Sequence, residues 1–242
     1  GLSGSGGLGQ GVRQEDVRGG NKAEMLEALV GREPLRAASF IVTVYGDVAE
    51  PRGGVLWMGT LIEICADVGL SETLVRTAVS RLVAAGQLTG ERIGRRSYYR
   101  LTPAARREFA AAARLLLEPD AVPGALAFVM PRDAEGAERL QAAGFVTLGR
   151  GLMVGPDRDV GGAASMRLRA FPAEGEAALR GFAARTWDLD RHRAAYESFL
   201  RRFAPLEEAL PGFNGRDRLV ARLLMVHAYR GAALRDPHLP SA

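Results

Sequence analysis

The stretch from Gly59 to Leu101 constrains the fold more than any other part of the sequence. Apolar residues recur at helical spacing in Thr60–Val68 and again in Glu72–Ala85, and a short turn containing Gly69 separates the two segments. Ser71 stands where an N-cap is expected, and Gly86 follows the second helix as a stop signal. Two helices joined by such a turn are typical of a helix-turn-helix.

A β-hairpin is expected directly after these helices. Leu88–Ile93 and Ser97–Leu101 predict two short strands around a turn at Gly94-Arg95-Arg96. Thr102-Pro103 then starts another helix, with a cap followed by proline at the first helical position. The order helix, turn, helix, hairpin predicts a winged helix-turn-helix.

The second helix has two chemically different faces. Val75, Ala78, Val79 and Leu82 form an apolar stripe, and short polar side chains and arginines cover the opposite side. A helix with such a face suits the major groove of DNA, although an ordinary solvated surface would look the same in isolation. The candidate DNA-binding residues are Ser71, Thr73, Arg76, Thr77, Ser80, Arg81, Arg95, Arg96 and Tyr98.

Each of these candidates has an expected role. Thr73, Arg76, Thr77 and Ser80 are expected to face the groove, and Arg81 is expected to meet phosphate together with the free N–H groups at Ser71. Arg95 and Arg96 suit the DNA backbone or the minor groove, and tyrosine hydroxyls often bond phosphate oxygens. Because neighbouring strand residues point to opposite faces, we expect Tyr99 to pack inward and Tyr98 to stay accessible.

The distribution of charge favours an anionic partner more than its total does. The net charge is +4 and the pI is about 9.7, and 31 of the 32 basic residues are arginine, a bias that GC-rich codons would also produce. Between Arg76 and Arg107 there are eight arginines, and the acids are Glu91 and the adjoining Glu108. This local excess is the electrostatic footprint expected of a nucleic-acid-binding surface.

Composition narrows the class of protein. An apolar content of 47% and a charged content of 25% suit a globular chain, and no run of about 18 apolar residues predicts a membrane span. The glycine-rich start lacks the apolar core of a signal peptide, and the single Cys65 suits a reducing compartment, so a cytoplasmic location is expected.

The remaining segments predict an α+β, multidomain chain. We expect a flexible tail with a short helix from Asn21 over 1–33, and a DNA-binding domain over 34–118 in which Ser39–Tyr45 fits either a strand or a helix. Residues 119–186 predict a small α/β domain with a ferredoxin-like order of elements, including a half-exposed strand at Ser165–Phe171 and a helix at Glu174–Arg185. Residues 187–242 predict a helical domain.

The sequence offers little for catalysis or for a cofactor. No Cys/His cluster, nucleophile elbow or phosphate-binding glycine loop is present, so we expect no metal, no cofactor and no enzymatic activity. Asp188 with Asp190 and His192 suits a helix N-terminus better than a metal site. Trp57 and Trp187 are expected in the core.

Three blocks resemble the PaaX family of bacterial transcriptional regulators. They are GDVAEPRGGVLWMGTLIEICADVGLSETLVRTAVSRLVAAGQLTGERIGRRSYYRLT, WDLDRHRAAYESFLRRFAPL and HAYRGAALRDPHLP. The resemblance implies a repressor with a winged helix-turn-helix, a Cas2-like middle domain and a helical carboxy-terminal part. It further implies a homodimer that binds double-stranded operator DNA, and release by an acyl-coenzyme A such as phenylacetyl-coenzyme A in a phenylacetate-type operon.

An acyl-coenzyme A needs arginines for its phosphates and an apolar slot for its acyl group. The candidate effector-binding residues are His227, Tyr229, Arg230 and Arg235, although His227 also suits a satisfied core histidine. Three alternatives stay open: a coenzyme A thioester hydrolase, a metal-dependent nuclease using Asp157 or Asp159, and an architectural DNA binder without an effector.

Overall fold

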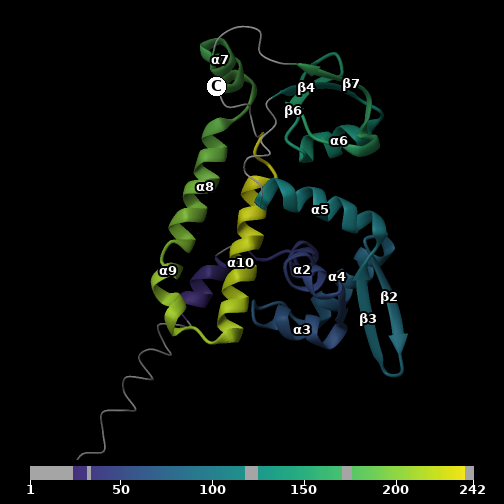
Figure 1. The fold of residues 1–242 in the computed structure, drawn as a ribbon, viewed down its shortest axis with the longest axis vertical. Coiled ribbons are helices and arrows are strands. Elements are labelled where there is room, and N and C mark those ends of the chain that lie inside the picture. Colours follow the sequence, from purple (N-terminus) through teal and green to yellow (C-terminus); the bar gives the residue numbers. More distant parts are fainter. Residues whose placement is uncertain (1–23, 32–33, 118–124, 171–175, 238–242) are drawn as a thin grey trace, which may run out of the picture. The chain divides into compact units, whose positions relative to one another are not determined.

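The computed structural model describes residues 24–31, 34–117, 125–170 and 176–237. The chain is α+β and contains two antiparallel sheets among these residues (Figure 1). The described residues divide into two compact units, 24–105 with 201–227 and 106–200 with 228–237. The expected tail, the Asn21 cap, Phe171 and Glu174 lie outside the described residues.

The first unit begins with a helix over 24–30 and with α2 at Ala37–Val44. The ambiguous segment Ser39–Tyr45 is therefore helical, despite its β-branched residues. Phe40, Ile41, Val44 and Tyr45 are fully buried at helical spacing, and burial of this face overrides the strand preference of Val and Ile. The chain continues through a π-helical turn at Tyr45–Ala49.

The two helices of the predicted helix-turn-helix are confirmed as α3 at Met58–Ala66 and α4 at Glu72–Ala84. Gly69 has a φ of +82°, which only glycine adopts freely, and the turn reverses there. The Ser71 hydroxyl accepts a hydrogen bond from the Leu74 N–H at 3.3 Å, as predicted for an N-cap. The buried residues of α4 are the predicted stripe, Val75, Ala78, Val79 and Leu82.

The first sheet has the strand order β1-β3-β2, from Val55–Trp57, Arg96–Leu101 and Leu88–Ile93. The predicted hairpin is confirmed, but its turn is shorter than expected. Gly94 and Arg95 alone form the turn, with Gly94 at φ +60°, and Arg96 pairs with Ile93 inside the ladder. A glycine at the first central position favours this two-residue turn because its twist matches that of the strands.

After the hairpin, α5 spans Pro103–Leu117. Its predicted start is confirmed, because the Thr102 hydroxyl accepts a hydrogen bond from the Ala105 N–H at 3.2 Å. This helix passes from the first unit into the second, whose boundary lies between Ala105 and Arg106.

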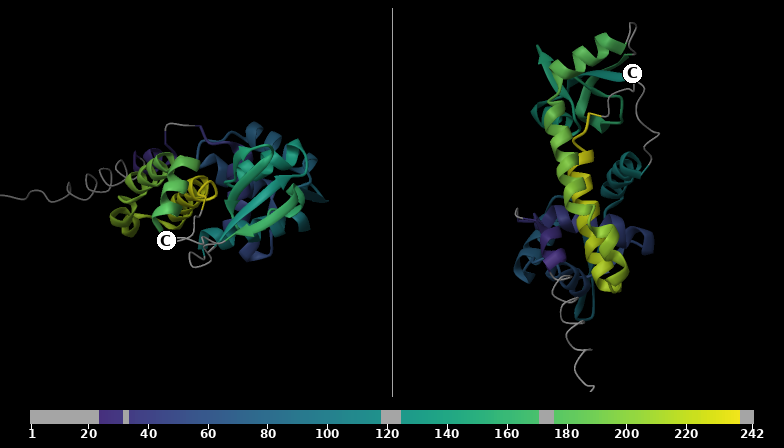
Figure 2. Two further views of the ribbon diagram at one scale, coloured as in Figure 1. Left: turned by 90° about the horizontal axis from the view of Figure 1, so that it is seen from above. Right: turned by 90° about the vertical axis from the view of Figure 1, so that its left-hand side faces the viewer.

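The second unit contains a four-stranded sheet, which is seen from two further sides in Figure 2. Its strands are antiparallel, in the order β5-β6-β4-β7. In chain order its elements are β4, α6, β5, β6, a 3-10 turn at Gly161–Ala163, and β7. Their bounds are Leu126–Pro131, Ala134–Ala142, Val146–Gly149, Leu152–Pro156 and Ala164–Ala170. The 3-10 turn at Gly161–Ala163 lies in the connection between β6 and β7.

Each face of this sheet carries its own core. Val129, Met153 and Phe145 pack with Leu140 of α6 on one face. On the other face, Leu126 and Val154 pack with Ala183 of α7, which spans Glu176–Thr186, and with Trp187. Trp187 is 5% exposed, which confirms its expected core position, and its indole Nε1 donates to the Gly144 carbonyl at 3.1 Å.

The chain ends in helices α8 at Leu189–Phe203, α9 at Leu206–Ala209 and α10 at Gly215–Ala233. Asp188 caps α8 as predicted, because its carboxylate accepts the Arg191 N–H at 3.1 Å. The second unit includes α8 up to Leu200 and α10 from Ala228 onward. Within the described ranges no helix is long and apolar enough to cross a bilayer.

Candidate nucleic-acid interface

The predicted polar face of α4 is exposed along its whole length. Thr73, Arg76, Thr77, Ser80 and Arg81 all lie on the side away from the buried stripe. The apolar stripe fixes this orientation, because four buried side chains at helical spacing leave only one way for the helix to dock. The structure therefore presents these five side chains on one surface of α4.

Two contacts on α4 hold side chains close to the helix. The Arg76 Nε donates to Glu72 Oε1 at 2.7 Å, and the Thr77 hydroxyl donates to the Thr73 carbonyl at 2.8 Å. Sequence reasoning missed Glu72, although its spacing of four residues before Arg76 is the signal for such a pair. Both side chains of the ion pair remain more than half exposed, so the pair is weak and exchangeable.

The two arginines of the hairpin have different surroundings. Arg95 lies in the turn and is exposed. Arg96 lies in β3, and its guanidinium carbon stands 4.9 Å from the centre of the Trp57 ring. Trp57 is only partly buried, so its predicted core position is wrong: the indole lies on β1 at the edge of the sheet, where Arg96 covers it.

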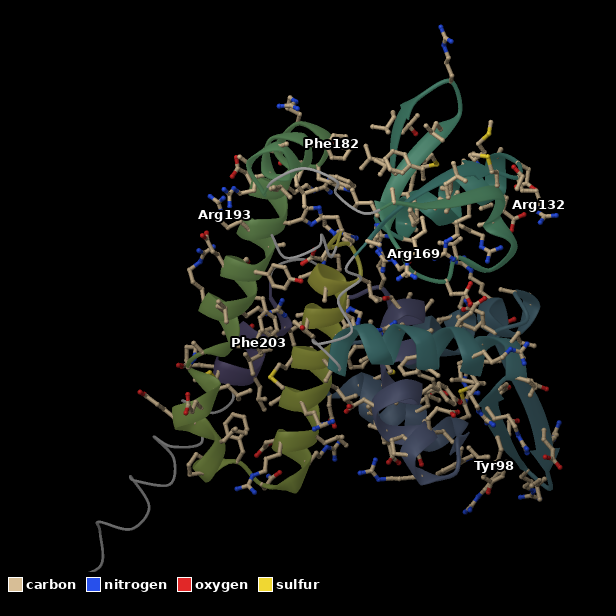
Figure 3. The ribbon with its side chains drawn as sticks, turned by 45° about the horizontal axis from the view of Figure 1, so that its top comes forward. Tyr98, Arg132, Arg169, Phe182, Arg193 and Phe203 are labelled. Atoms are coloured by element: carbon tan, nitrogen blue, oxygen red, sulfur yellow. The ribbon has the colours of Figure 1, made fainter. Side chains whose placement is uncertain are left out.

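The two tyrosines of β3 point to opposite faces, as predicted. Tyr99 faces Gly90 across the ladder, and a Cβ at Gly90 would lie only 2.7 Å from Tyr99 Cε1. Tyr98 pairs with Trp57 and Glu91, and it lies at the periphery of the unit in Figure 3. Both rings are half-buried, so the difference between them is one of face rather than of exposure.

A cleft of about 470 Å³ separates α4 from the hairpin. Its lining combines apolar side chains with arginine, serine and one carboxylate. It is lined by Met58, Arg76, Val79, Ser80, Val83, Gly90, Glu91, Arg92, Ser97 and Tyr99. Gly90 and Arg92 were not among the predicted site residues; the signal that would have found Gly90 is a glycine inside a strand, which marks a close approach of another group.

The surface of α4 and the hairpin is strongly basic. It carries six arginines against two carboxylates, Glu72 and Glu91. Glu91 binds Arg100 at 3.1 Å across the hairpin, and the Arg92 Nε donates to the Gly94 carbonyl at 3.2 Å. The excess of four positive charges lies on one helix and one hairpin, which is a surface suited to an anionic polymer.

The candidate effector residues fall into both units. In the first unit the His227 Nδ1 lies 3.0 Å from the Thr43 hydroxyl oxygen, and its ring meets Phe40 edge to face at 5.5 Å. In the second unit the Tyr229 ring lies 5.6 Å from Phe199, and Arg235 is exposed. His227 therefore makes the packing and hydrogen-bond contacts of a core histidine.

Arg230 also lies in the second unit. Its guanidinium stands 5.5 Å from the centre of the Phe109 ring. Burial lowers the pKa of Arg230 because it removes the charged form from water.

The alternative chemistries find little support in the side-chain contacts. No group of three or more metal-ligating residues exists in the part of the chain that the structure describes. Asp157 is bound by Arg167 and Arg169, and Asp159 accepts the Gly161 N–H at 2.9 Å.

The single thiol is an equally poor reactive group. Cys65 is fully buried, and burial raises the pKa of its thiol to about 12. The thiol is therefore neutral at physiological pH, and the nucleophilic thiolate does not form.

Comparisons with known proteins agree on one family. The family model described as "PaaX-like protein" matches residues 36–105, and "PaaX-like protein C-terminal domain" matches residues 187–242. "Transcriptional repressor PaaX" of Escherichia coli strain K12 is 30% identical over 240 residues, which cover 89% of this chain and 76% of that protein. A solved structure, the uncharacterized protein Rv0674 from Mycobacterium tuberculosis, is 26% identical over 84% of this chain and 85% of its own, with a TM-score of 0.44. The chain belongs to the PaaX family.

Proposed function

We propose that this protein is a DNA-binding transcriptional repressor of a phenylacetate-type catabolic operon. The name of the Escherichia coli relative, "Transcriptional repressor PaaX", supports the proposal. The observation that carries it is the surface of α4 and the hairpin, which bears six arginines and a cleft whose lining includes Arg76, Arg92, Ser80 and Ser97. This surface fits a regulator better than an enzyme, because arginines and hydroxyl groups suit the binding of an anionic polymer.

The DNA-binding domain, over residues 34–118, is proposed to be a winged helix-turn-helix with α4 as the reading helix and β2–β3 as the wing. Thr73, Arg76, Thr77 and Ser80 meet base edges in the major groove, and a bidentate contact from Arg76 to guanine is worth about 1–3 kcal/mol of discrimination. Ser71, Arg81, Arg95, Arg96 and Tyr98 meet phosphate or the minor groove.

The other two domains are proposed to carry the regulation. The strand order β5-β6-β4-β7, with one helix after β4, supports a ferredoxin-like, Cas2-like middle domain over residues 119–186. The helical domain over residues 187–242 supplies the effector and dimer contacts. A cytoplasmic homodimer then places two reading helices about 34 Å apart on successive major grooves of a partly palindromic operator.

The effector is proposed to be an acyl-coenzyme A, bound with His227, Tyr229, Arg230 and Arg235. Arginines suit its phosphates, and the aromatic contacts of Tyr229 supply apolar surface for an acyl group. Effector binding shifts the dimer to a state in which the spacing of the two reading helices no longer fits the operator. This shift requires that the effector bind that state more tightly than the DNA-binding state. Calorimetry with phenylacetyl-coenzyme A tests this part: stoichiometric binding that releases DNA supports it, and turnover of the thioester contradicts it.

The DNA-binding proposal is tested by selecting a site from a random DNA pool and titrating that site across salt. Three phosphate-binding arginines per subunit predict a slope of log K against log salt of about −5 for a dimer. The selected site should bind at least tenfold tighter than a shuffled one. An affinity that does not change with salt concentration, or equal affinities for selected and shuffled DNA, would contradict sequence-specific repression.

A further inference from the structure

The C-terminal helix α10 holds the turn of the helix-turn-helix with a two-point ion pair. Arg216, in the first turn of α10, donates from Nε to Asp67 Oδ2 at 2.7 Å and from Nη2 to Asp67 Oδ1 at 2.5 Å. Asp67 is the residue directly after α3, in the turn that leads to α4. A contact between residues 149 positions apart therefore reaches the segment that sets the reading helix.

A second ion pair of the same kind lies further along the helix. Arg222 donates from Nε and Nη2 to the two carboxylate oxygens of Asp47, both at 2.7 Å. Asp47 belongs to the π-helical turn that follows α2. The Asp67 and Asp47 side chains are only 22% and 11% exposed, so both carboxylates lie largely under the arginines that bind them.

Apolar packing completes the docking of α10 on the same unit. Val220, Leu223 and Leu224 are at most 4% exposed, and His227 contacts Thr43 and Phe40 of α2. The stripe from Arg216 through Val220 and Leu223 to His227 has helical spacing, so one face of α10 lies against the DNA-binding unit. Figure 1 shows α10 beside α2 and α3.

The form of the ion pairs matters for position. A guanidinium that donates two parallel hydrogen bonds to one carboxylate fixes the direction of the contact as well as its distance. Around Asp67 the backbone N–H groups of Val68, Gly69 and Leu70 already bond within the turn. The Asp67 side chain is thus the polar link from this turn to α10, and the link is directional.

We propose that Asp67 is a positioning residue for DNA recognition, and that Arg216 acts through it to hold the angle of α4. This inference rests on the proposed DNA-binding function and deepens it. Sequence discrimination by α4 then depends on a helix near the other end of the chain. α10 continues to Ala233, past His227, where the first unit ends.

Asp67→Asn, Arg216→Ala and the double variant test the proposal. Asp67→Asn keeps the shape of the side chain and removes its charge. Arg218→Ala is the matched control, because Arg218 is an exposed arginine two residues along the same helix and its loss changes the net charge equally. The measured quantities are the ratio of Kd values for shuffled and selected DNA at one salt concentration, the melting temperature, and hydrogen exchange of the Leu70–Leu74 amides.

We expect the Kd ratio to fall about tenfold in Asp67→Asn and in Arg216→Ala, which is the loss of one good base contact. The double variant should lose no more than either single variant, because both changes remove the same contact. Exchange at Leu70–Leu74 should be faster in all three, and Arg218→Ala should match the wild type. Arg216→Lys keeps the positive charge but loses the two parallel hydrogen bonds, so its Kd ratio should lie between those of the wild type and of Arg216→Ala.

Other outcomes overturn the proposal. If the variants bind selected and shuffled DNA more weakly by the same factor, only charge was lost. If the melting temperature falls while the Kd ratio stays unchanged, the ion pair only stabilises the fold. Wild-type protein that does not discriminate refutes sequence-specific repression and, with it, a positioning role in recognition. Hydrogen exchange at Leu70–Leu74 is measured without DNA, so it tests the positioning proposal independently of the DNA-binding function. Unchanged exchange in the variants would show that Arg216 does not hold the turn.

Discussion

Arg95 and Arg96 are neighbours in sequence, but their replacement by alanine should have different consequences. Arg95 lies in the two-residue turn and is exposed, whereas Arg96 lies in β3 with its guanidinium 4.9 Å from the centre of the Trp57 ring. Both are proposed to meet DNA phosphate. Arg96 has a second role within the folded protein, and Arg95 has none in the contacts described above.

The expected magnitudes follow from these contacts. A phosphate-binding arginine contributes about 0.9 to the slope of log K against log salt, so each single variant should lower the slope by about 0.9 per subunit. A cation–π contact at an exposed site is worth about 0.5–1 kcal/mol. Arg96→Ala should therefore lower the melting temperature by about 1–4 °C, and Arg95→Ala should leave it unchanged.

Salt titrations on selected and shuffled DNA, together with thermal melts, measure both effects. Arg96→Lys is the control for stacking, because it keeps the charge and loses the planar guanidinium. It should retain most of the salt slope and show most of the loss in stability. If Arg95→Ala destabilises the fold as much as Arg96→Ala, the assignment of the stacking contact is wrong. If neither changes the salt slope, the hairpin does not contact phosphate.

Three further predictions concern single positions. Gly90→Ala places a methyl group 2.7 Å from Tyr99 Cε1 and should cost about 1–3 kcal/mol of unfolding free energy in denaturant melts, whereas Gly212→Ala, in open space, should cost far less. Ser71→Ala removes the cap of α4 and should cost about 1 kcal/mol in the same assay; no loss would mean that the 3.3 Å contact contributes nothing. Cys65 has a thiol pKa of about 12, so a thiol reagent at pH 8 should label it only after denaturant is added.

Local signals in the sequence predicted local structure well. Ser71, Thr102 and Asp188 each cap a helix as expected, because an N-cap depends on residues only two or three positions away. Such signals also placed the hairpin and the strands of the second sheet. The sequence left Ser39–Tyr45 open between a strand and a helix, because a short and mostly apolar run shows no clear alternation of polar and apolar residues.

Contacts between segments that are distant in the sequence could not be predicted from the sequence. Nothing near Asp47 or Asp67 indicates an arginine 149 or more positions away, since a single charge in a turn looks solvated. Trp57 was misplaced for the same reason: its exposure depends on β1 being an edge strand and on Arg96 lying over it. The face of α4 was predictable because helical spacing defines it, and the cleft beside it was not, because the hairpin closes it.

The carboxylates on this surface have a physical explanation if the surface reads DNA. An exposed pair four residues apart on a helix, such as Arg76 with Glu72, is worth only about 0.3–0.5 kcal/mol. A bidentate contact from Arg76 to guanine is worth about 1–3 kcal/mol of discrimination. It therefore remains favourable for Arg76 to leave Glu72 and bind the guanine. At a wrong base the arginine gains less and stays paired with Glu72. The pair thus subtracts about 0.3–0.5 kcal/mol from the contact at the right base, which leaves most of the discrimination in place, and it holds the guanidinium beside the helix when no guanine is present.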